Sequence, residues 1–470
     1  MMRSLFSGVA GLKNHQTRMD VIGNNIANVN TTGFKSSRVT FVDTLQQTLT
    51  GASAPTDTKG GTNPKQIGLG SSIGSIDTIM TDGSVQSTGK NTDLCLSGSG
   101  FFVVKGPNGT FYTRDGAFEF DAQGNYVLPG SGLYVQGWTA DENGSINTAS
   151  DVGNIVVQAG KSMNATATTK AVYSNNLDAS CATIASITQG GVKKETLGDE
   201  YTASSTAPVT IAMSNGETFT MSDGKYTVGH SLPVSTIITA YDSLGNAHDV
   251  PVYFTKTKVD STGGNEWTVS VATDGSGTST INESDGSTTT ISMGDERLKF
   301  DTDGKYASGD GNITLTLTNG STGSQAITLQ LNSLTQYAGS STIASNTDGN
   351  AMGTLSSIAI DSAGVITGSY TNGINRQEAQ VALAQFANAA GLTKSGTSLY
   401  SVSNNSGTPT KYYTANDIGT TITGSALEMS NVDLANEFSD MIITQRGFQS
   451  NSKIITVSDE MLETLINMKR

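Results

Sequence analysis

The side chains that most often carry out chemistry are few in this chain of 470 residues. Its three histidines, His15, His230 and His248, are far apart, and none belongs to a His-Glu-x-x-His motif, which would bring two imidazoles to one metal ion. No Gly-x-Ser-x-Gly motif opens a predicted helix, and there is no Gly-x4-Gly-Lys-Ser/Thr phosphate loop. These patterns disfavour metal-dependent, nucleophilic and nucleotide chemistry, so we expect no catalytic residue, no metal and no cofactor.

Aspartates recur with an Asp-x-x-Gly spacing beside strand-like sequence, at Asp121, Asp141, Asp301 and Asp361. The stretch 301–304, Asp-Thr-Asp-Gly, resembles the start of a calcium loop, in which carboxylates at alternate positions bind the ion. It lacks the later ligands and the closing bidentate glutamate of such a loop. We therefore predict hairpin turns at these aspartates. A carboxylate pair for glycoside hydrolysis stays open as a minor alternative, because nothing in the sequence singles one out.

The two cysteines, Cys95 and Cys181, lie in regions of different composition, and their number and spacing fit neither a disulfide framework nor a zinc site. We expect two unpaired thiols that pack as small apolar side chains. A covalent link between subunits through either cysteine is the alternative. Trp138 and Trp267 lie in strand-like segments, and we expect them in a core rather than on a carbohydrate-binding surface.

The charge balance makes nucleic-acid binding improbable, and the distribution of apolar residues argues against a membrane-spanning segment. With 27 basic and 41 acidic residues the formal net charge is −14, whereas a nucleic-acid-binding protein needs a basic surface. No stretch approaches the roughly 18 consecutive apolar residues of a membrane-spanning helix. The first ten residues also lack the apolar segment of a secretory signal peptide, so we expect no nucleic acid, no membrane insertion and, if the protein is exported, a route without a cleaved signal peptide.

The N-terminal region predicts an amphipathic helix from residue 5 to residue 29, because its apolar residues recur at steps of three and four. Three glycines, Gly8, Gly11 and Gly23, weaken it by about 1 kcal/mol each, so the helix needs a partner. The apolar residues are Leu5, Val9, Leu12, Met19, Ile22, Ile26 and Val29.

The C-terminal region predicts a second helix. Ser430 to Asp433 resembles a capping box in which the carboxylate is that of Asp433 and not that of the usual glutamate. A strict four-three alternation follows, which is typical of a coiled-coil seam. We predict a terminal helix pair that assembles, and a long helix packed on a globular core is the alternative. The apolar seam residues are Leu434, Phe438, Met441, Phe448, Ile455, Leu462 and Ile466, interrupted by the polar Gln445, Ser452 and Asp459.

Between the helices the sequence is typical of antiparallel β structure. Only 14% of the residues are charged and 54 are glycine, which favours sheets with one solvated face over a large α/β core. Short alternating segments separated by turns indicate an all-β domain inserted into another. Residues 274–290 are predicted to form an exposed loop. The predicted strands include 101–104, 116–120, 125–128, 236–241, 250–254, 266–271 and 313–317.

Motifs near both ends resemble the signatures of the bacterial flagellar rod and hook family. Residues 93–102 and 112–116 also match the family, except that Cys95 stands where a small residue such as Ala is more usual. The terminal motifs are Asp-Val-Ile-Gly-Asn-Asn-Ile-Ala-Asn at 20–28, Thr-Thr-Gly-Phe-Lys at 31–35, Ser-Asn-Val-Asp-Leu at 430–434 and Gln-Arg-Gly-Phe-Gln-Ser-Asn at 445–451.

Within the family, residues 241–254 and 385–392 resemble the hook subunit more than other axial components. The alternative is a distal rod or hook–filament junction protein, and the 160–340 block is expected to separate a hook from a rod subunit. The resemblance is loose over 180–230 and 255–330.

The resemblance implies a mixed fold. Its N- and C-terminal helices would pair as a coiled-coil core, with two nested, mainly antiparallel β domains between them. The expected parts are a helical core from 1–33 and 430–470, a linker that bridges subunits at 34–75, an inner β domain from 76–159 and 341–429, and an outer β domain at 160–340.

The resemblance also implies a structural role without enzymatic activity. The expected function is a subunit that polymerises into a curved hollow tube, the hook, which acts as a universal joint between rod and filament. The expected partners are further copies of this chain, distal rod and hook–filament junction proteins, a hook cap during assembly and the flagellar type III export apparatus. The expected location is the extracellular flagellum.

Overall fold

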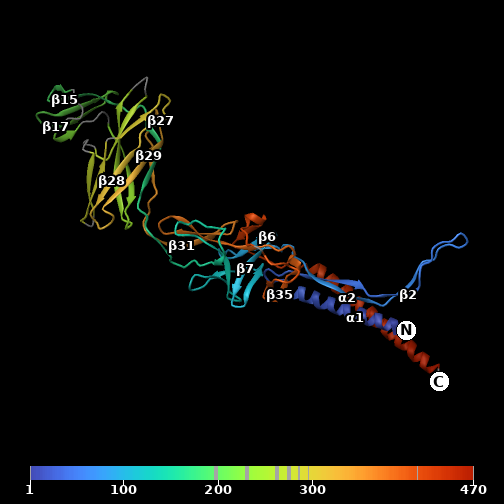
Figure 1. Cartoon of the computed structure of the whole chain (residues 1–470). Coiled ribbons are helices and arrows are strands. Elements are labelled where there is room, and N and C mark those ends of the chain that lie inside the picture. Colours follow the sequence, from blue (N-terminus) through green and yellow to red (C-terminus); the bar gives the residue numbers. More distant parts are fainter. Residues whose placement is uncertain are drawn as a thin grey trace. The chain divides into compact units, whose positions relative to one another are not determined.

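A computed structural model describes residues 2–194, 200–227, 232–259, 264–272, 277–283, 286–294, 296–409 and 411–468, so His230 lies outside the described residues. The chain divides into two compact units, Met1–Lys161 with Leu355–Arg470, and Ser162–Thr354. Most of the described chain is β structure, with one long helix near each end (Figure 1). This confirms the predicted combination of terminal helices and β segments.

The terminal helices are α1, Met2–Ala27, and α2, Leu434–Asn467. The predicted capping box is wrong in register. Asp433 is the N-cap of α2, and its Oδ1 accepts a hydrogen bond from the backbone N–H of Ala435 at 2.9 Å. Ser430 and Asn431 do not cap α2, because the helix begins only at Leu434 and the Asn431 side chain is hydrogen-bonded to other segments.

Residues 37–78 form a long two-stranded arm. β1 (Ser37–Asp43) pairs with β4 (Ser71–Thr78), and farther out β2 (Gln46–Thr50) pairs with β3 (Lys65–Gly68). Isolated bridges such as Thr56↔Lys59 continue the pairing toward the tip, which points away from the helices in Figure 1. Both strands of the outer arm are exposed, and Leu45 is 83% accessible. An isolated two-stranded hairpin is only marginally stable in water. The exposed outer arm therefore has little stabilisation of its own in the single chain.

The β part of the first unit is built from chain segments on both sides of the second unit. β11 pairs with β33, β7 with β34, β8 with β36 and β6 with β37. Phe102, Phe118 and Tyr126 are among the fully buried residues of its core. The elements are β5 (Val85–Ser87), β6 (Leu94–Ser97), β7 (Phe101–Gly106), β8 (Gly109–Thr113), β9 (Glu119–Phe120), β10 (Tyr126–Leu128), β11 (Leu133–Thr139), β12 (Gly153–Asn154), β31 (Gly353–Ile360), β32 (Val365–Tyr370), β33 (Asn375–Val381), β34 (Leu383–Ala384), η1 (Ala389–Gly391), β35 (Thr393–Gly396), β36 (Leu399–Ser401), η2 (Asn416–Ile418), β37 (Thr421–Gly424) and β38 (Ala426–Glu428).

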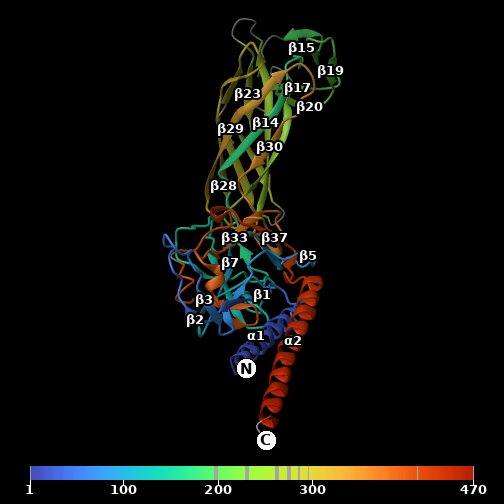
Figure 2. The same cartoon turned by 90° about the vertical axis from the view of Figure 1, so that its right-hand side faces the viewer.

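The second unit contains two larger sheets, in the orders β24-β25-β28-β29-β14-β30 and β21-β22-β23-β26-β27. Both contribute to one apolar core that includes Trp267, which confirms that this tryptophan is a core residue. Strands β15 to β20 form a smaller module with its own core around Ile187 and Tyr201 (Figure 2). The strands are β13 (Ser162–Met163), β14 (Lys170–Asp178), β15 (Ile184–Gln189), β16 (Val192–Lys194), β17 (Glu200–Ala203), β18 (Val209–Met213), β19 (Thr218–Met221), β20 (Gly224–Thr227), β21 (Val234–Tyr241), β22 (Ala247–Lys258), β23 (Glu266–Ser270), β24 (Thr278–Asn282), β25 (Thr288–Met293), β26 (Glu296–Phe300), β27 (Tyr306–Ser308), β28 (Gly311–Leu317), β29 (Ser324–Tyr337) and β30 (Ala344–Thr347).

The predicted exposed loop at 274–290 is wrong where the structure describes it. Residues 278–282 form β24, and 288–290 begin β25, which pairs with both β24 and β28. Thr289 and Ile291 face inward and are buried. The many threonines of this segment are β-branched residues that favour strands, whereas the prediction treated them as loop composition. Residues 274–276 and 284–285 of the segment lie outside the described part.

The predicted Asp-x-x-Gly turns are confirmed. Asp301 Oδ1 accepts hydrogen bonds from the backbone N–H groups of Asp303 at 2.9 Å and Lys305 at 2.8 Å. Gly304 has a φ of +76°, a conformation that glycine adopts at low cost. The carboxylate thus organises a turn by binding backbone donors. The same pattern occurs at Asp121, Asp141, Asp242 and Asp361.

Candidate assembly surface

Helices α1 and α2 pack side by side and antiparallel (Figures 1 and 2). Gly8 lies against Ile455, and nearer the other end of α1 Arg18 forms an ion pair with Asp440 at 2.9 Å. The helices can approach closely because Gly8 and Gly11 of α1 have no side chains. A Cβ added to Gly11 would lie 2.8 Å from the side chain of Asn451. Glycines that weaken α1 as an isolated helix therefore serve its contact with α2.

His15 lies at the middle of the helix contact. Its ring meets Gly447, where an added Cβ would lie 2.7 Å from ring atoms, and it contacts Phe41 of β1 edge-on at 6.2 Å between ring centroids. The buried Nδ1 has no hydrogen-bond partner within the described part of the chain. Burial, and secondarily the charge of Arg18, lower the pKa of His15 below its usual value. The neutral imidazole is therefore the form that fits between the helices.

Asn25 joins three elements near the end of α1. Its Nδ2 donates to Glu437 Oε1 of α2 at 2.9 Å and to the backbone O of Ser37 at 2.8 Å, while its Oδ1 accepts from the Ser37 N–H at 3.0 Å. Asn25 is almost fully buried, and burial is the main cause that raises the pKa of Glu437. The amide side chain thus fixes α1 against both α2 and the first strand of the arm.

Apart from Ile455, which lies against Gly8, the residues of α2 that contact α1 differ from the predicted seam. Glu437, Asp440, Gly447 and Asn451 make the contacts described above, and Thr444 and Ser458 are the buried residues of α2. These positions have the same four-three spacing but are polar or small. A search for apolar periodicity could not find these polar and small contact residues of α2. The glycines of α1 could have indicated them, because glycines on a helix allow a second helix to pack closely.

Most of the predicted seam residues of α2 are accessible to solvent in the single chain. The predicted apolar residues of α1 are more buried than those of α2. Phe438 is 50% and Ile466 66% exposed, Leu434 and Phe448 are exposed as well, and Met441, Ile455 and Leu462 are half-buried. On α1, Ile22 is buried, Val9 is exposed, and Leu5, Leu12, Met19, Ile26 and Val29 are half-buried. Val29 lies in the turn after α1. The sequence reasoning missed further exposed apolar residues, which are Phe6, Ile442, Ile443, Ile454, Met461, Leu465 and Met468.

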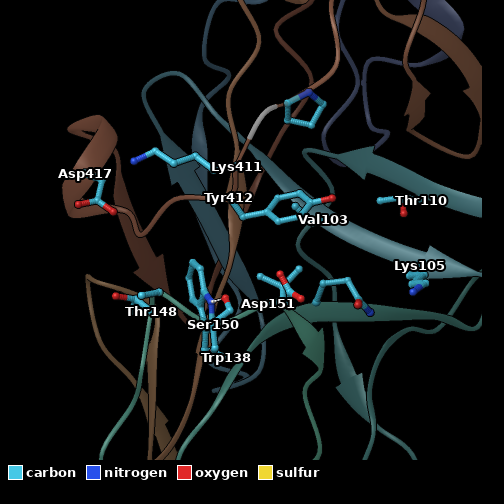
Figure 3. A pocket seen from close by; sticks show the side chains of 14 residues that line it. Val103, Lys105, Thr110, Trp138, Thr148, Ser150, Asp151, Lys411, Tyr412 and Asp417 are labelled. Atoms are coloured by element: carbon cyan, nitrogen blue, oxygen red, sulfur yellow. Dashed lines mark hydrogen bonds between the residues drawn. The ribbon is translucent and has the colours of Figure 1, made fainter.

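One pocket of about 720 Å³ lies in the β part of the first unit (Figure 3). Trp138 forms part of its wall, is only 3% exposed, and donates from its indole N–H to the backbone O of Ser150 at 2.9 Å. It is a core residue, as predicted. Lys105, Lys411 and Asp417 are among the charged residues that line the pocket.

Both cysteines are free thiols, with Cys95 buried and Cys181 half-buried, in line with the expected packing of small apolar side chains. Burial is the main cause that raises the pKa of Cys95 to about 11. Among the described residues, no group of three or more His, Cys, Asp or Glu side chains is placed to hold a metal ion. No described helix combines the length and apolar character needed to cross a bilayer.

Four domain families match the chain, in the order expected from the terminal and middle motifs. They are the flagella basal body rod protein family at residues 5–35, the flagellar hook protein FlgE/F/G D1 domain at 95–168, the flagellar basal body protein FlaE D2 domain at 225–350, and the flagellar basal body rod FlgEFG protein C-terminal family at 423–468.

Relatives that align over their whole length point to the same family. The chain is 39% identical to the flagellar hook protein FlgE of Treponema pallidum over 504 residues and 40% identical to that of Borreliella burgdorferi over 495 residues, with 100% of each chain covered. It is also 30% identical to the flagellar basal-body rod protein FlgG of Bacillus subtilis, again over 100% of both chains. The middle block therefore does not separate hook from rod proteins as expected. The two hook proteins align with clearly higher identity, and the chain belongs to the flagellar hook protein family.

Proposed function

We propose that this chain is the subunit that polymerises into the curved, hollow hook of the bacterial flagellum, a joint that transmits torque from rod to filament while it bends. One observation of the molecule supports the proposal beyond family membership. The contacts of α2 with α1 are mostly made by polar or small residues, and much of the apolar seam, including Phe438, Phe448 and Ile466, is accessible. Exposed apolar residues gathered on one element mark an interaction site, and copies of the same helix offer matching residues.

In this proposal the terminal helices form a coiled-coil core, with 1–33 and 430–470 as its domain. The predicted seam residues from Leu434 to Ile466 would contact neighbouring subunits, while the contacts around Gly11 and Asn451 hold α1 on α2 within one subunit. The outer arm would be the bridge to a neighbour, since its apolar residues Leu49 and Ile67 lie on a hairpin whose two strands are exposed in the single chain.

The nested β domains would form the outside of the tube. A bent tube that rotates must lengthen and shorten each line of subunits once per turn, so contacts between outer domains must be weak enough to slide. The low content of charged residues, 14% of the chain, and the threonine-rich outward positions of the second unit suit polar contacts of that kind. We also propose the extracellular flagellum as the location, with distal rod, junction, cap and type III export proteins as partners.

Electron microscopy of negatively stained protein tests the proposal. Full-length protein in polymerising salt is expected to form tubes, and a chain without residues 1–33 and 430–470 is expected to stay monomeric. Curved tubes support a hook, whereas straight tubes support the rod alternative, which the B. subtilis FlgG alignment keeps open. Tubes from the truncated chain would overturn the assignment of assembly to the terminal helices.

A further inference from the structure

The two terminal segments meet in a buried ion cluster. Lys35, eight residues after α1, places Nζ 2.5 Å from Glu428 Oε1 and donates to the backbone O of Thr81 at 2.7 Å. Both side chains are only 1% exposed. Lys35 belongs to the N-terminal Thr-Thr-Gly-Phe-Lys motif, whereas Glu428 ends β38 shortly before α2. The cluster therefore joins residues from opposite ends of the chain.

The β part of the same unit supplies the remaining partners. Arg114 Nη1 lies 3.4 Å from Glu428 Oε2 and 3.2 Å from Asp82 Oδ1. The backbone N–H of Gly83 donates to Glu428 Oε1 at 2.9 Å. The Glu428 carboxylate thus faces two cations and one backbone donor inside the protein, which compensates its burial.

Hydrogen bonds from backbone N–H groups also join the same two segments. The Gly33 N–H donates to the backbone O of Glu428 at 2.8 Å, and the Ser36 N–H donates to Asn431 Oδ1 at 2.8 Å. Gly33 has a φ of +63°, and a Cβ there would lie 2.5 Å from the backbone N of Asp115. Only glycine fits this position, so the motif is shaped to dock between residue 428 and the segment after β8 that contains Arg114 and Asp115.

Docking of one end without the other leaves buried charge uncompensated. Without residue 428, Lys35 would be buried near Arg114 with its main carboxylate partner missing; without residue 35, Glu428 would lose its closest cation. Breaking one side of a buried ion pair is strongly unfavourable, although the intact pair adds little net stability. The energetic effect of the pair is therefore to couple two docking events.

We propose that Lys35, Arg114, Asp82 and Glu428 form a two-ended clasp that makes docking of the N- and C-terminal segments onto the β part a single all-or-none step. The clasp acts within one chain and does not require that the proposed tube forms. α1 and α2 are then ordered together or released together, and a subunit with only one helix docked is suppressed.

Hydrogen exchange of backbone amides in the full chain tests the clasp. The reporters are the amides of Gly33 and Ser36 at one end and of Met429 and Ala435 at the other. Glu428→Gln is expected to raise exchange at both ends by the same factor, on the order of 100-fold. A matched control is Glu378→Gln, which removes another buried carboxylate paired with Lys161 and Arg376 in this unit and is expected to leave the reporters unchanged.

Two outcomes would overturn the clasp. The first is that the reporter amides at one end stay protected from exchange while those at the other end exchange rapidly. This outcome counts in any variant and in the wild-type chain, whether the protein is assembled or not. The second comes from a double-mutant cycle: Lys35→Met with Glu428→Met is expected to raise exchange by far less than the product of the two single changes. Factors that multiply would mean that the two ends dock independently. Glu428→Gln retains an acceptor for the Gly83 amide, so this variant remains informative if the Met variants fail to fold.

Discussion

Single residues in this protein act mostly as connectors, and their surroundings explain their types. Asn25 bonds to a helix and a strand at once, and Asp242 organises a turn with both of its carboxylate oxygens. The sequence pattern identified the Asp-x-x-Gly turns, because such a turn is a local hydrogen-bonding unit. It did not identify His15 as a contact of α2, because that role depends on Gly447 more than 400 positions away.

At the residue scale, we expect the helix contact to weaken in acid through His15. The pKa of His15 in the folded protein lies below the free value of 6.5, so the unfolded chain binds the proton more readily. The stability that neutral His15 provides is present above pH 6.5 and is lost as the pH falls below it. Helix melting followed by circular dichroism between pH 7.5 and 5 measures this, and His15→Gln should remove that part of the pH dependence. An unchanged dependence in the variant would contradict it.

Asp242→Asn is expected to destabilise the second unit by about 1–3 kcal/mol. The buried Asp242 Oδ2 accepts from Asn319 Nδ2 at 2.7 Å and Asn246 Nδ2 at 3.0 Å, and an amide would turn a donor toward one of these donors. Hydrogen bonds lower the pKa of Asp242 against the opposing effect of burial, so this stability is present above about pH 4 and is lost in acid. Denaturant unfolding measures the cost. An equal loss in Asp121→Asn, in a fully exposed turn, would show that burial is not the reason.

At the scale of elements, α1 and α2 show two different uses of heptad spacing. The pattern of large apolar residues on α2 predicted a seam, and within the single chain α1 is instead contacted mostly by an adjacent face of small and polar residues, with Ile455 as the shared position. Both faces repeat every seven residues, so periodicity alone cannot decide which one a given partner covers. The apolar face stays accessible for the assembly contact that we propose.

Phe448→Asp is expected to abolish tube formation and leave the β structure folded. Phe448 is 39% exposed in the single chain, so the charge costs little until a second helix covers it, when an unpaired carboxylate would be buried. Leu462→Asp should act in the same way. Microscopy and far-ultraviolet circular dichroism measure assembly and fold, and Gln449→Asp adds the same charge at the neighbouring exposed position as a control. Normal tubes from Phe448→Asp would contradict the predicted seam.

Gly23→Ala is expected to stabilise α1 by about 1 kcal/mol, because alanine is the better helix former. No atom lies within 4 Å of a Cβ added there. Gly11→Ala should gain much less or lose stability, since its Cβ would meet Asn451 at 2.8 Å. Thermal unfolding of helical circular dichroism compares the two variants. An equal gain at both positions would mean that α1 and α2 do not approach so closely in solution.

At the scale of the whole molecule, two compact units are formed by one chain that leaves the first unit, completes the second and returns. Residues 341–354 lie in the second unit, where β30 pairs with β14. The segments on either side of the insertion pair strand by strand, as in β11 with β33. Each unit has its own buried core, so each has its own source of stability.

We therefore expect two separable unfolding transitions. Trp267→Ala removes a fully buried side chain from the core of the second unit and should cost that unit about 3–5 kcal/mol. Trp138→Ala should affect the first unit alone, where Trp138 is 3% exposed. Differential scanning calorimetry measures both, and each variant should shift one transition only. A single transition that moves in both variants would contradict independent units.

The sequence by itself determined the features that depend on near neighbours and on composition: two terminal helices, aspartate turns, short strands with buried tryptophans, and family motifs at both ends. The tertiary structure decided which distant segments meet. Lys35 pairs with Glu428, Gly11 faces Asn451, and strands on either side of the insertion share a sheet. Periodicity reports which face of an element is apolar, whereas pairing between distant elements depends on side-chain size, charge and hydrogen bonding in three dimensions, which no local pattern contains.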